Sequence, residues 1–267
     1  MKKYFSFFRI QFCFGLQYRP AFLSAIITQI PWGLMECLAY HTLHASNTES
    51  FPMEFSALTS YIWLKEAFLL LFSTWMTDNE IFDLILNGDV SYELCRPVSI
   101  YDMWFARSIG GRMFSASLRC VPILLIALLL PRPYNLSLPQ NAEAFWLFVL
   151  TLLLGVFVAV AFCMLVYILS FFTLSPQGLR MLMTGAVEFL SGATLPLPFI
   201  PYPVRKILEL LPFASMQNVP FRVYSGDLSG TDCMYAIFLQ LFWLAVLVFL
   251  GKLLCRCAER RIVVQGG

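Results

Sequence analysis

Six long apolar stretches dominate this sequence and limit the folds that it can adopt. Each has about the length of the roughly 20 residues that an α-helix needs to cross a lipid bilayer, and together they cover residues 21–43, 56–76, 103–130, 144–170, 179–199 and 234–254. A transmembrane β-barrel would show shorter segments of alternating polarity instead. Only short loops remain between the stretches, so the sequence predicts one all-α integral membrane domain over residues 1–267.

The composition excludes most other classes of protein. Of the 267 residues, 59% are hydrophobic and 13% are charged, whereas an ordinary soluble domain has roughly 45–50% and about 25%. This is too little polar surface to cover a water-soluble globule of this size. A disordered chain, a secreted disulfide scaffold and a nucleic-acid-binding protein are therefore all excluded, and we expect membrane lipids rather than nucleic acid around the chain.

The distribution of Lys and Arg predicts the orientation, because cytoplasmic flanks of membrane helices carry an excess of both. With the N-terminus inside, the outer flanks hold four such residues, and the inner flanks hold twelve: Lys2, Lys3, Arg9, Arg19, Arg96, Arg107, Arg112, Arg180, Lys252, Arg256, Arg260 and Arg261. We therefore expect a multi-pass protein with cytoplasmic N- and C-termini.

Two further segments are expected to lie along the membrane surfaces. Residues 1–20 place Phe5, Phe8 and Phe12 on one helical face with Lys2 and Lys3 opposite, which is typical of an amphipathic elbow helix in the inner headgroup layer. Residues 196–232 are interrupted by several prolines. This pattern favours short outer helices that re-enter the outer leaflet between spans five and six.

The largest cytoplasmic segment, residues 77–99, is acidic and carries a single basic residue, Arg96. Within it, Ile81, Leu84 and Ile85 recur at helical spacing, and Gly88 is a typical helix stop. Two interpretations stay open from the residues alone. The segment is either a short helix that another protein can bind or a solvated loop whose acidic residues keep it soluble.

Five charged residues fall inside the predicted spans, and each costs a few kcal/mol at mid-bilayer. They are Glu36, Lys65, Glu66, Arg119 and Glu188. They either line a transport pathway, where they contact substrate or relay protons, or form interhelical pairs, such as Glu36 or Glu188 with Arg119 or Lys65. The sequence leaves both interpretations open.

Several catalytic motifs are absent from the sequence. It contains no G-x-x-x-x-G-K-[ST] phosphate loop, and no G-x-S-x-G or H-E-x-x-H motif. His41 and His44 have helical spacing but lack a nearby third ligand, so we expect no metal site. We expect no catalytic residues either, and any ATP must be bound by another chain.

Residues 87–99, with the sequence NGDVSYELCRPVS, resemble the G-x-L-x-x-x-L-L-R-P-V-S signature of one branch of the ABC-2 permeases. The similarity extends to the Met-Lys-Lys-Tyr start, to Leu211-Pro212-Phe213 and to the C-terminal RIVVQGG over residues 261–267. It follows the whole chain in order and spacing. One departure is Cys95, where the family usually has Leu.

The resemblance implies the six-span permease subunit of an ABC exporter in a bacterial cytoplasmic membrane. Residues 77–99 then form a coupling element, on which the resemblance assigns roles to Ile81, Asp83, Leu84, Ile85, Gly88, Glu93, Arg96 and Pro97. The three apolar residues would insert into a groove of the ATPase, Asp83, Glu93 and Arg96 would make polar contacts, and Pro97 would set the angle into span three.

The same resemblance implies the partners. Two nucleotide-binding subunits would hold ATP and Mg²⁺, with no cofactor on this chain. A second permease, identical or different, would complete the pathway as a homodimer or heterodimer. The cargo would be an amphiphilic small molecule or peptide.

Two other functions remain as alternatives. An ion-coupled secondary transporter would use Glu36, Glu66 or Glu188 as proton sites and would transport without an ATPase. A membrane-embedded enzyme acting on lipids would show turnover without partners, although the catalytic motifs named above are missing.

Overall fold

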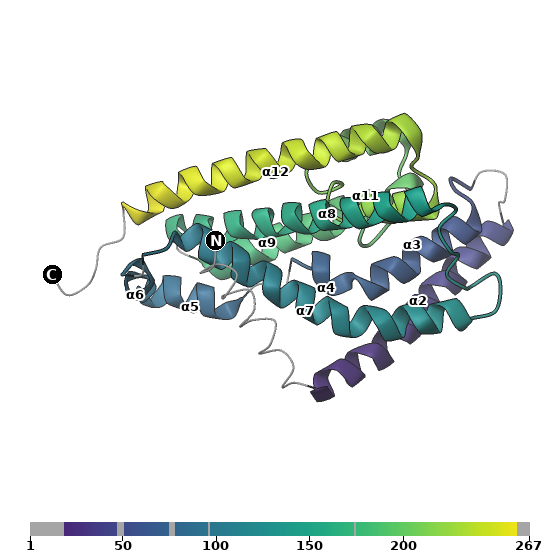
Figure 1. Cartoon of the computed structure of the whole chain (residues 1–267), viewed down its shortest axis with the longest axis horizontal. Coiled ribbons are helices and arrows are strands. Elements are labelled where there is room, and N and C mark those ends of the chain that lie inside the picture. The colour runs from purple at the N-terminus through teal and green to yellow at the C-terminus, as the bar shows by residue number, and fades with distance from the viewer. Residues whose placement is uncertain (1–18, 47–50, 75–77, 96, 174, 261–267) are drawn as a thin grey trace.

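The computed structural model describes residues 19–46, 51–74, 78–95, 97–173 and 175–260, and over these ranges the chain forms helices joined by loops. The helices run mostly along one common direction and give an elongated bundle (Figure 1). The predicted all-α fold is therefore confirmed for the described part of the chain. The elbow helix predicted over residues 1–20 lies almost wholly outside it.

Among the described residues, three helices are long and apolar enough to cross a membrane. They are α7 (Ile100–Leu129), α8 (Ala142–Leu169), which continues into the 3-10 turn η2 (Ser170–Phe172), and α12 (Gly230–Glu259). These match the predicted spans 103–130, 144–170 and 234–254. Helix α2 (Arg19–Ser46) has the length of a span but is less apolar.

The other two predicted spans are shorter helices than the sequence suggested. Span two is divided at Phe68 into α3 (Phe55–Ala67) and α4 (Leu69–Phe72). Span five becomes α9 (Pro176–Leu190), whose 15 residues extend about 22 Å, short of the roughly 30 Å hydrocarbon core. Ser191 caps the end of α9, and Gly192, with φ +82°, then leads into a proline-rich stretch that contains η3 (Leu197–Phe199).

A buried arginine explains how the chain tolerates the end of α4 inside the bundle. Helix ends leave backbone carbonyls without partners, and Arg112 of α7 donates hydrogen bonds to the carbonyls of Leu71 and Ser73 at 2.9 and 2.7 Å. It also contacts Cys163 Sγ at 3.2 Å. Arg112 was counted in the sequence among the inner-flank charges, but it is buried and stabilises this helix end.

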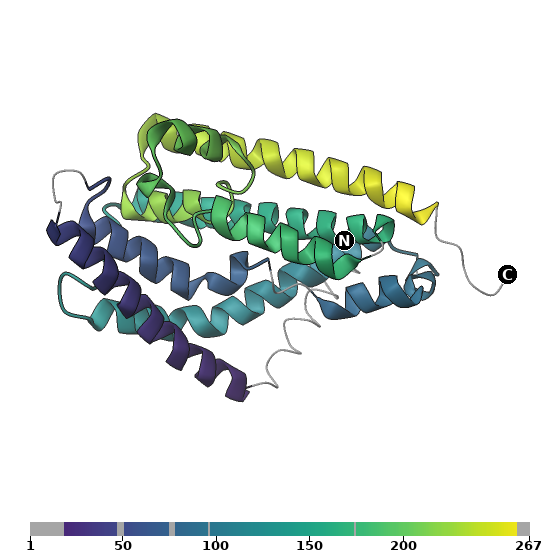
Figure 2. The same ribbon diagram turned by 180° about the vertical axis from the view of Figure 1, so that it is seen from behind.

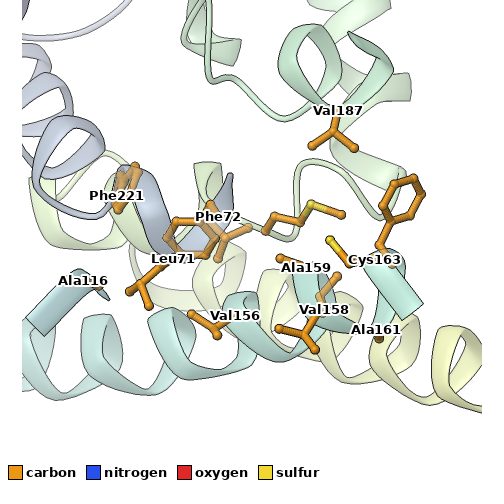
Figure 3. Close-up of a cluster of buried hydrophobic side chains, with 14 of the residues drawn as sticks. Leu71, Phe72, Ala116, Val156, Val158, Ala159, Ala161, Cys163, Val187 and Phe221 are labelled. Carbon is orange, nitrogen blue, oxygen red and sulfur yellow. The ribbon is translucent and has the colours of Figure 1, made fainter. Parts of the chain in front are cut away.

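Helix α8 forms the centre of the bundle. Its small side chains, including Val158 and Ala159, pack against α4, α9 and α11 (Asn218–Ser225) (Figure 3). Small residues allow close approach of membrane helices. The closest approach is at Gly155, where a Cβ atom would lie 2.1 Å from the carbonyl oxygen of Met216.

The outer surface of the bundle is apolar. On α12, which lies along one side of the bundle (Figure 1), Phe238, Leu241, Phe242 and Phe249 are all exposed. Large apolar side chains on the outside of an apolar core are typical of a helix that faces lipid.

Two pairs of short helices lie at the two ends of the bundle. Helices α5 (Asn79–Asn87) and α6 (Val90–Leu94) lie at the same end as the C-terminal end of α12 (Figure 1). Helices α10 (Tyr202–Leu210) and α11 lie at the opposite end (Figure 2). With the orientation predicted from Lys and Arg, α5 and α6 are on the cytoplasmic side.

Candidate functional site

The helix pair α5 and α6, which the orientation predicted from Lys and Arg places in the cytoplasm, begins and ends at clear sequence signals. The Asp78 carboxylate accepts a hydrogen bond from the backbone N–H two residues later at 3.1 Å and so caps α5. Gly88, with φ +78°, ends it in the left-handed conformation that glycine adopts most easily. The predicted helix stop at this glycine is therefore confirmed.

Polar contacts attach the start of α5 to three other helices. The Asp78 backbone N–H donates to the Tyr167 hydroxyl of α8 at 2.7 Å, and the Asp78 carboxylate pairs with Arg107 of α7 at 2.6 Å. Arg180 of α9 donates to Asn79 Oδ1 at 2.8 Å. Burial raises the pKa of Asp78 above its ordinary value, and the Arg107 charge partly offsets this effect. These contacts connect the start of α5 directly to α7, α8 and α9.

The inner face of the helix pair is covered by the chain itself, and two of the residues expected to contact the ATPase, Ile81 and Glu93, lie on it. Ile81 is fully buried, and Leu84 and Ile85 are half-buried against the core. Glu93 accepts a hydrogen bond from Trp104 Nε1 of α7 at 2.6 Å, and both side chains are buried. Ile81 and Glu93 thus stabilise the attachment of the pair to the bundle, and in this structure they are not accessible to a partner.

The outer face presents different residues, which we call the cytoplasmic patch: Asp83, Leu86 and Tyr92. Asp83 is exposed, and the exposed fractions of Leu86 and Tyr92 are 61% and 74%. The sequence contained a signal for Leu86, because residues three apart share one helix face and Asp83 precedes it by three. Pro97 is exposed at the turn into α7, and Arg96 lies outside the described residues.

A second candidate site is a cavity of about 780 Å³ between α2, α3 and α9. It brings together four of the five intramembrane charges singled out in the sequence, Glu36, Lys65, Glu66 and Glu188. The fifth, Arg119 of α7, is half-buried and is not among the residues that line this cavity.

The lysine in this cavity pairs with one carboxylate in particular. Lys65 Nζ lies 2.5 and 2.6 Å from the two carboxylate oxygens of Glu36, so one of the interhelical pairs considered from the sequence forms. Glu66 Oε1 is 3.9 Å from the same ammonium group, at the outer limit of an ion pair. This longer distance follows from the geometry of adjacent residues, which point about 100° apart on a helix.

An ion network joins α10 and α11 at the end of the bundle opposite α5 and α6. Arg222 of α11 donates to Asp227 Oδ2 at 2.5 Å and to Glu209 Oε1 of α10 at 2.6 Å. Burial lowers the pKa of Arg222, but the two carboxylates more than compensate and leave it above its ordinary value. These contacts fix α10 and α11 within the segment 196–232, for which the sequence predicted short outer helices.

Long helices with exposed apolar side chains, together with a charged cavity between α2, α3 and α9, are typical of a polytopic membrane protein. A family model described as ABC-2 family transporter protein matches residues 54–266, which is most of the chain. The chain therefore belongs to the ABC-2 family of transporter proteins and is a multi-pass membrane transport subunit. No curated protein matches the sequence. The more specific branch signature over residues 87–99 stays a prediction.

Proposed function

We propose that this chain is the permease subunit of an ATP-driven ABC exporter and that it forms half of the translocation pathway. Two nucleotide-binding subunits on separate chains hold ATP and Mg²⁺, and a second permease, identical or different, completes the pathway. The complex resides in a bacterial cytoplasmic membrane with both termini of this chain in the cytoplasm. The family membership and the arrangement of the cytoplasmic helix pair support the proposal.

The observation that carries the proposal is the contrast between the two faces of the helix pair, of which one is attached to the bundle and the other is exposed. Its inner face is fixed to α7, α8 and α9 through Asp78, Arg107 and their neighbours. Its outer face exposes Leu86 and Tyr92 beside acidic residues. An exposed aromatic side chain is a frequent centre of a protein–protein interface. When ATP closes the two nucleotide-binding subunits, force on this face moves three helices together.

The test is co-purification of the chain with its nucleotide-binding subunit from native membranes in mild detergent. The variant Leu86→Asp/Tyr92→Ala should weaken the association by about 30-fold, which corresponds to about 2 kcal/mol, the threshold for an interface hot spot. The matched control is Leu138→Asp, a similarly exposed leucine in the outer loop. Full association of the double variant contradicts the assignment of the cytoplasmic patch.

The second candidate, an ion-coupled secondary transporter, is favoured by one observation, the three carboxylates that line the intramembrane cavity. It requires that the chain transports alone in liposomes when a pH gradient is applied. Transport that appears only with the nucleotide-binding subunit and ATP excludes this candidate. Transport by the chain alone contradicts the ABC exporter.

A further inference from the structure

We propose that the cavity between α2, α3 and α9 binds the cargo and selects an amphiphilic organic cation with an N–H donor. This inference rests on the proposed function, because it assigns a substrate class to the pathway of a permease. Four observations carry it: the charge of the lining, a poorly compensated buried carboxylate, an unpartnered buried acceptor and the aromatic wall.

The lining of the cavity has an excess of negative charge. Among the described residues of the lining, Glu36, Glu66 and Glu188 provide three carboxylates, and Lys65 provides one ammonium group. Because Lys65 is already paired with Glu36 at 2.5 Å, it cannot compensate the other two carboxylates to the same degree. Charges inside a membrane are costly unless they are paired. The carboxylates of the cavity therefore attract a cationic ligand and repel an anionic one.

Glu66 is a deeply buried carboxylate of this cavity that lacks a close cationic partner. Its exposed fraction is 3%, and the nearest cation, Lys65 Nζ, is 3.9 Å away. Burial without close pairing makes an ionised carboxylate unfavourable. A positively charged ligand in the cavity supplies the missing charge.

Gln29 of α2 provides an independent observation on the same cavity. Its side chain is 7% exposed and lines the cavity, and its Oε1 atom has no hydrogen-bond partner among the described residues. A buried acceptor without a donor costs about 1–3 kcal/mol. The carboxamide oxygen can only accept a hydrogen bond, so the group that satisfies it must carry an N–H or O–H donor.

The remaining wall suits the apolar part of such a ligand. Trp32, Met35, Tyr40 and Leu69 line the cavity beside the charged residues. Aromatic rings attract cations through their negative faces. The volume of about 780 Å³ is within the range of about 300–1,000 Å³ for small-molecule sites, so one drug-sized aromatic cation fits.

The test uses two fluorescent probes of similar size and opposite charge, ethidium and anilinonaphthalene sulfonate. Ethidium is an aromatic cation with amino N–H donors. Binding is measured on the permease with its nucleotide-binding subunit, reconstituted in nanodiscs of zwitterionic lipid. We expect ethidium to bind saturably and the anion to bind at least tenfold more weakly.

Three variants separate the contributions of the lining. Glu66→Gln and Glu188→Gln each remove one charge without changing the shape, and each should weaken ethidium binding by about tenfold. Gln29→Leu removes the acceptor and should weaken it by about fivefold. The matched control, Glu143→Gln, removes an exposed carboxylate outside the cavity and should leave binding unchanged. Size-exclusion chromatography confirms that each variant is folded.

Equal binding of the two probes, or ethidium binding that survives all three variants, overturns the inference. A complex that hydrolyses ATP and transports another cargo but does not bind ethidium overturns the substrate class and leaves the proposed function intact. A chain that binds ethidium through these residues but never associates with a nucleotide-binding subunit supports the site and contradicts the exporter. The two failures are therefore distinguishable.

Discussion

Replacement of Lys65 by methionine tests the ion pair that joins α2 and α3. The exposed fractions of the Lys65 and Glu36 side chains are 7% and 14%, so water screens their attraction little. Loss of one partner of a buried pair costs about 3–5 kcal/mol because the other charge is left buried. For a chain of this size, about 1 kcal/mol shifts the unfolding temperature by roughly 2–4 °C. Lys65→Met should therefore lower it by about 10 °C.

Glu36→Gln should be milder, because Lys65 keeps Glu66 at 3.9 Å as a second carboxylate. The double variant Glu36→Gln/Lys65→Met should be more stable than Lys65→Met alone, since it removes both members of the pair, with a coupling energy of about 1–3 kcal/mol. This asymmetry between the two single variants is specific to the geometry of the site.

The assay is thermal unfolding in mild detergent with a thiol-reactive fluorescent dye. Cys37 and Cys163 are buried free cysteines and become reactive when the bundle opens. Glu143→Gln, in an exposed position, serves as the control. Equal unfolding temperatures for Lys65→Met and the wild type, or additive effects in the double variant, would refute the reasoning.

Two further predictions use the same assay. Gly155→Ala places a Cβ atom 2.1 Å from the Met216 carbonyl oxygen and should destabilise the fold by about 1–3 kcal/mol. Gly111→Ala places its Cβ atom in open space on a helix and should stabilise the fold by about 0.5–1 kcal/mol. Shifts of the unfolding temperature in the same direction for both variants contradict this prediction. Trp104→Phe removes the hydrogen-bond donor to buried Glu93 and should lower the free energy of unfolding by about 1.5–3 kcal/mol. The double variant Trp104→Phe/Glu93→Leu should recover part of that stability, because it also removes the unpaired carboxylate. A double variant that is less stable than Trp104→Phe shows that the hydrogen bond is not the cause.

Local sequence signals were sufficient for the class of protein and for several elements. Apolar length alone located α7, α8 and α12, because a bilayer demands long runs of apolar residues. Helical spacing and Gly88 located α5 and its end, since capping depends on neighbouring residues. The partnership of Lys65 and Glu36 was among the pairs considered, because charges inside a membrane require partners.

The sequence could not reveal which face of α5 stays free. Ile81 and Leu86 are both apolar and lie on the same short helix, yet one is fully buried and the other is 61% exposed. The difference depends on α7 and α8, which supply Arg107 and Tyr167 and fix the orientation of the helix. Amphipathic periodicity shows that one face is covered, but it does not show whether the chain itself or a partner covers it.

The sequence by itself thus determined that this chain is a helical membrane protein, because the physical demands of the bilayer act on every residue locally, and its resemblance to the ABC-2 permeases indicated a transport subunit. Only the tertiary structure decided that α4 ends at Phe72, within predicted span two, since Arg112, distant in sequence, satisfies the carbonyls exposed at the end of α4. It also decided that Glu66, Glu188 and Gln29 share one cavity. Such contacts join distant segments, and their energies depend on burial and distance, which no local pattern of residues encodes.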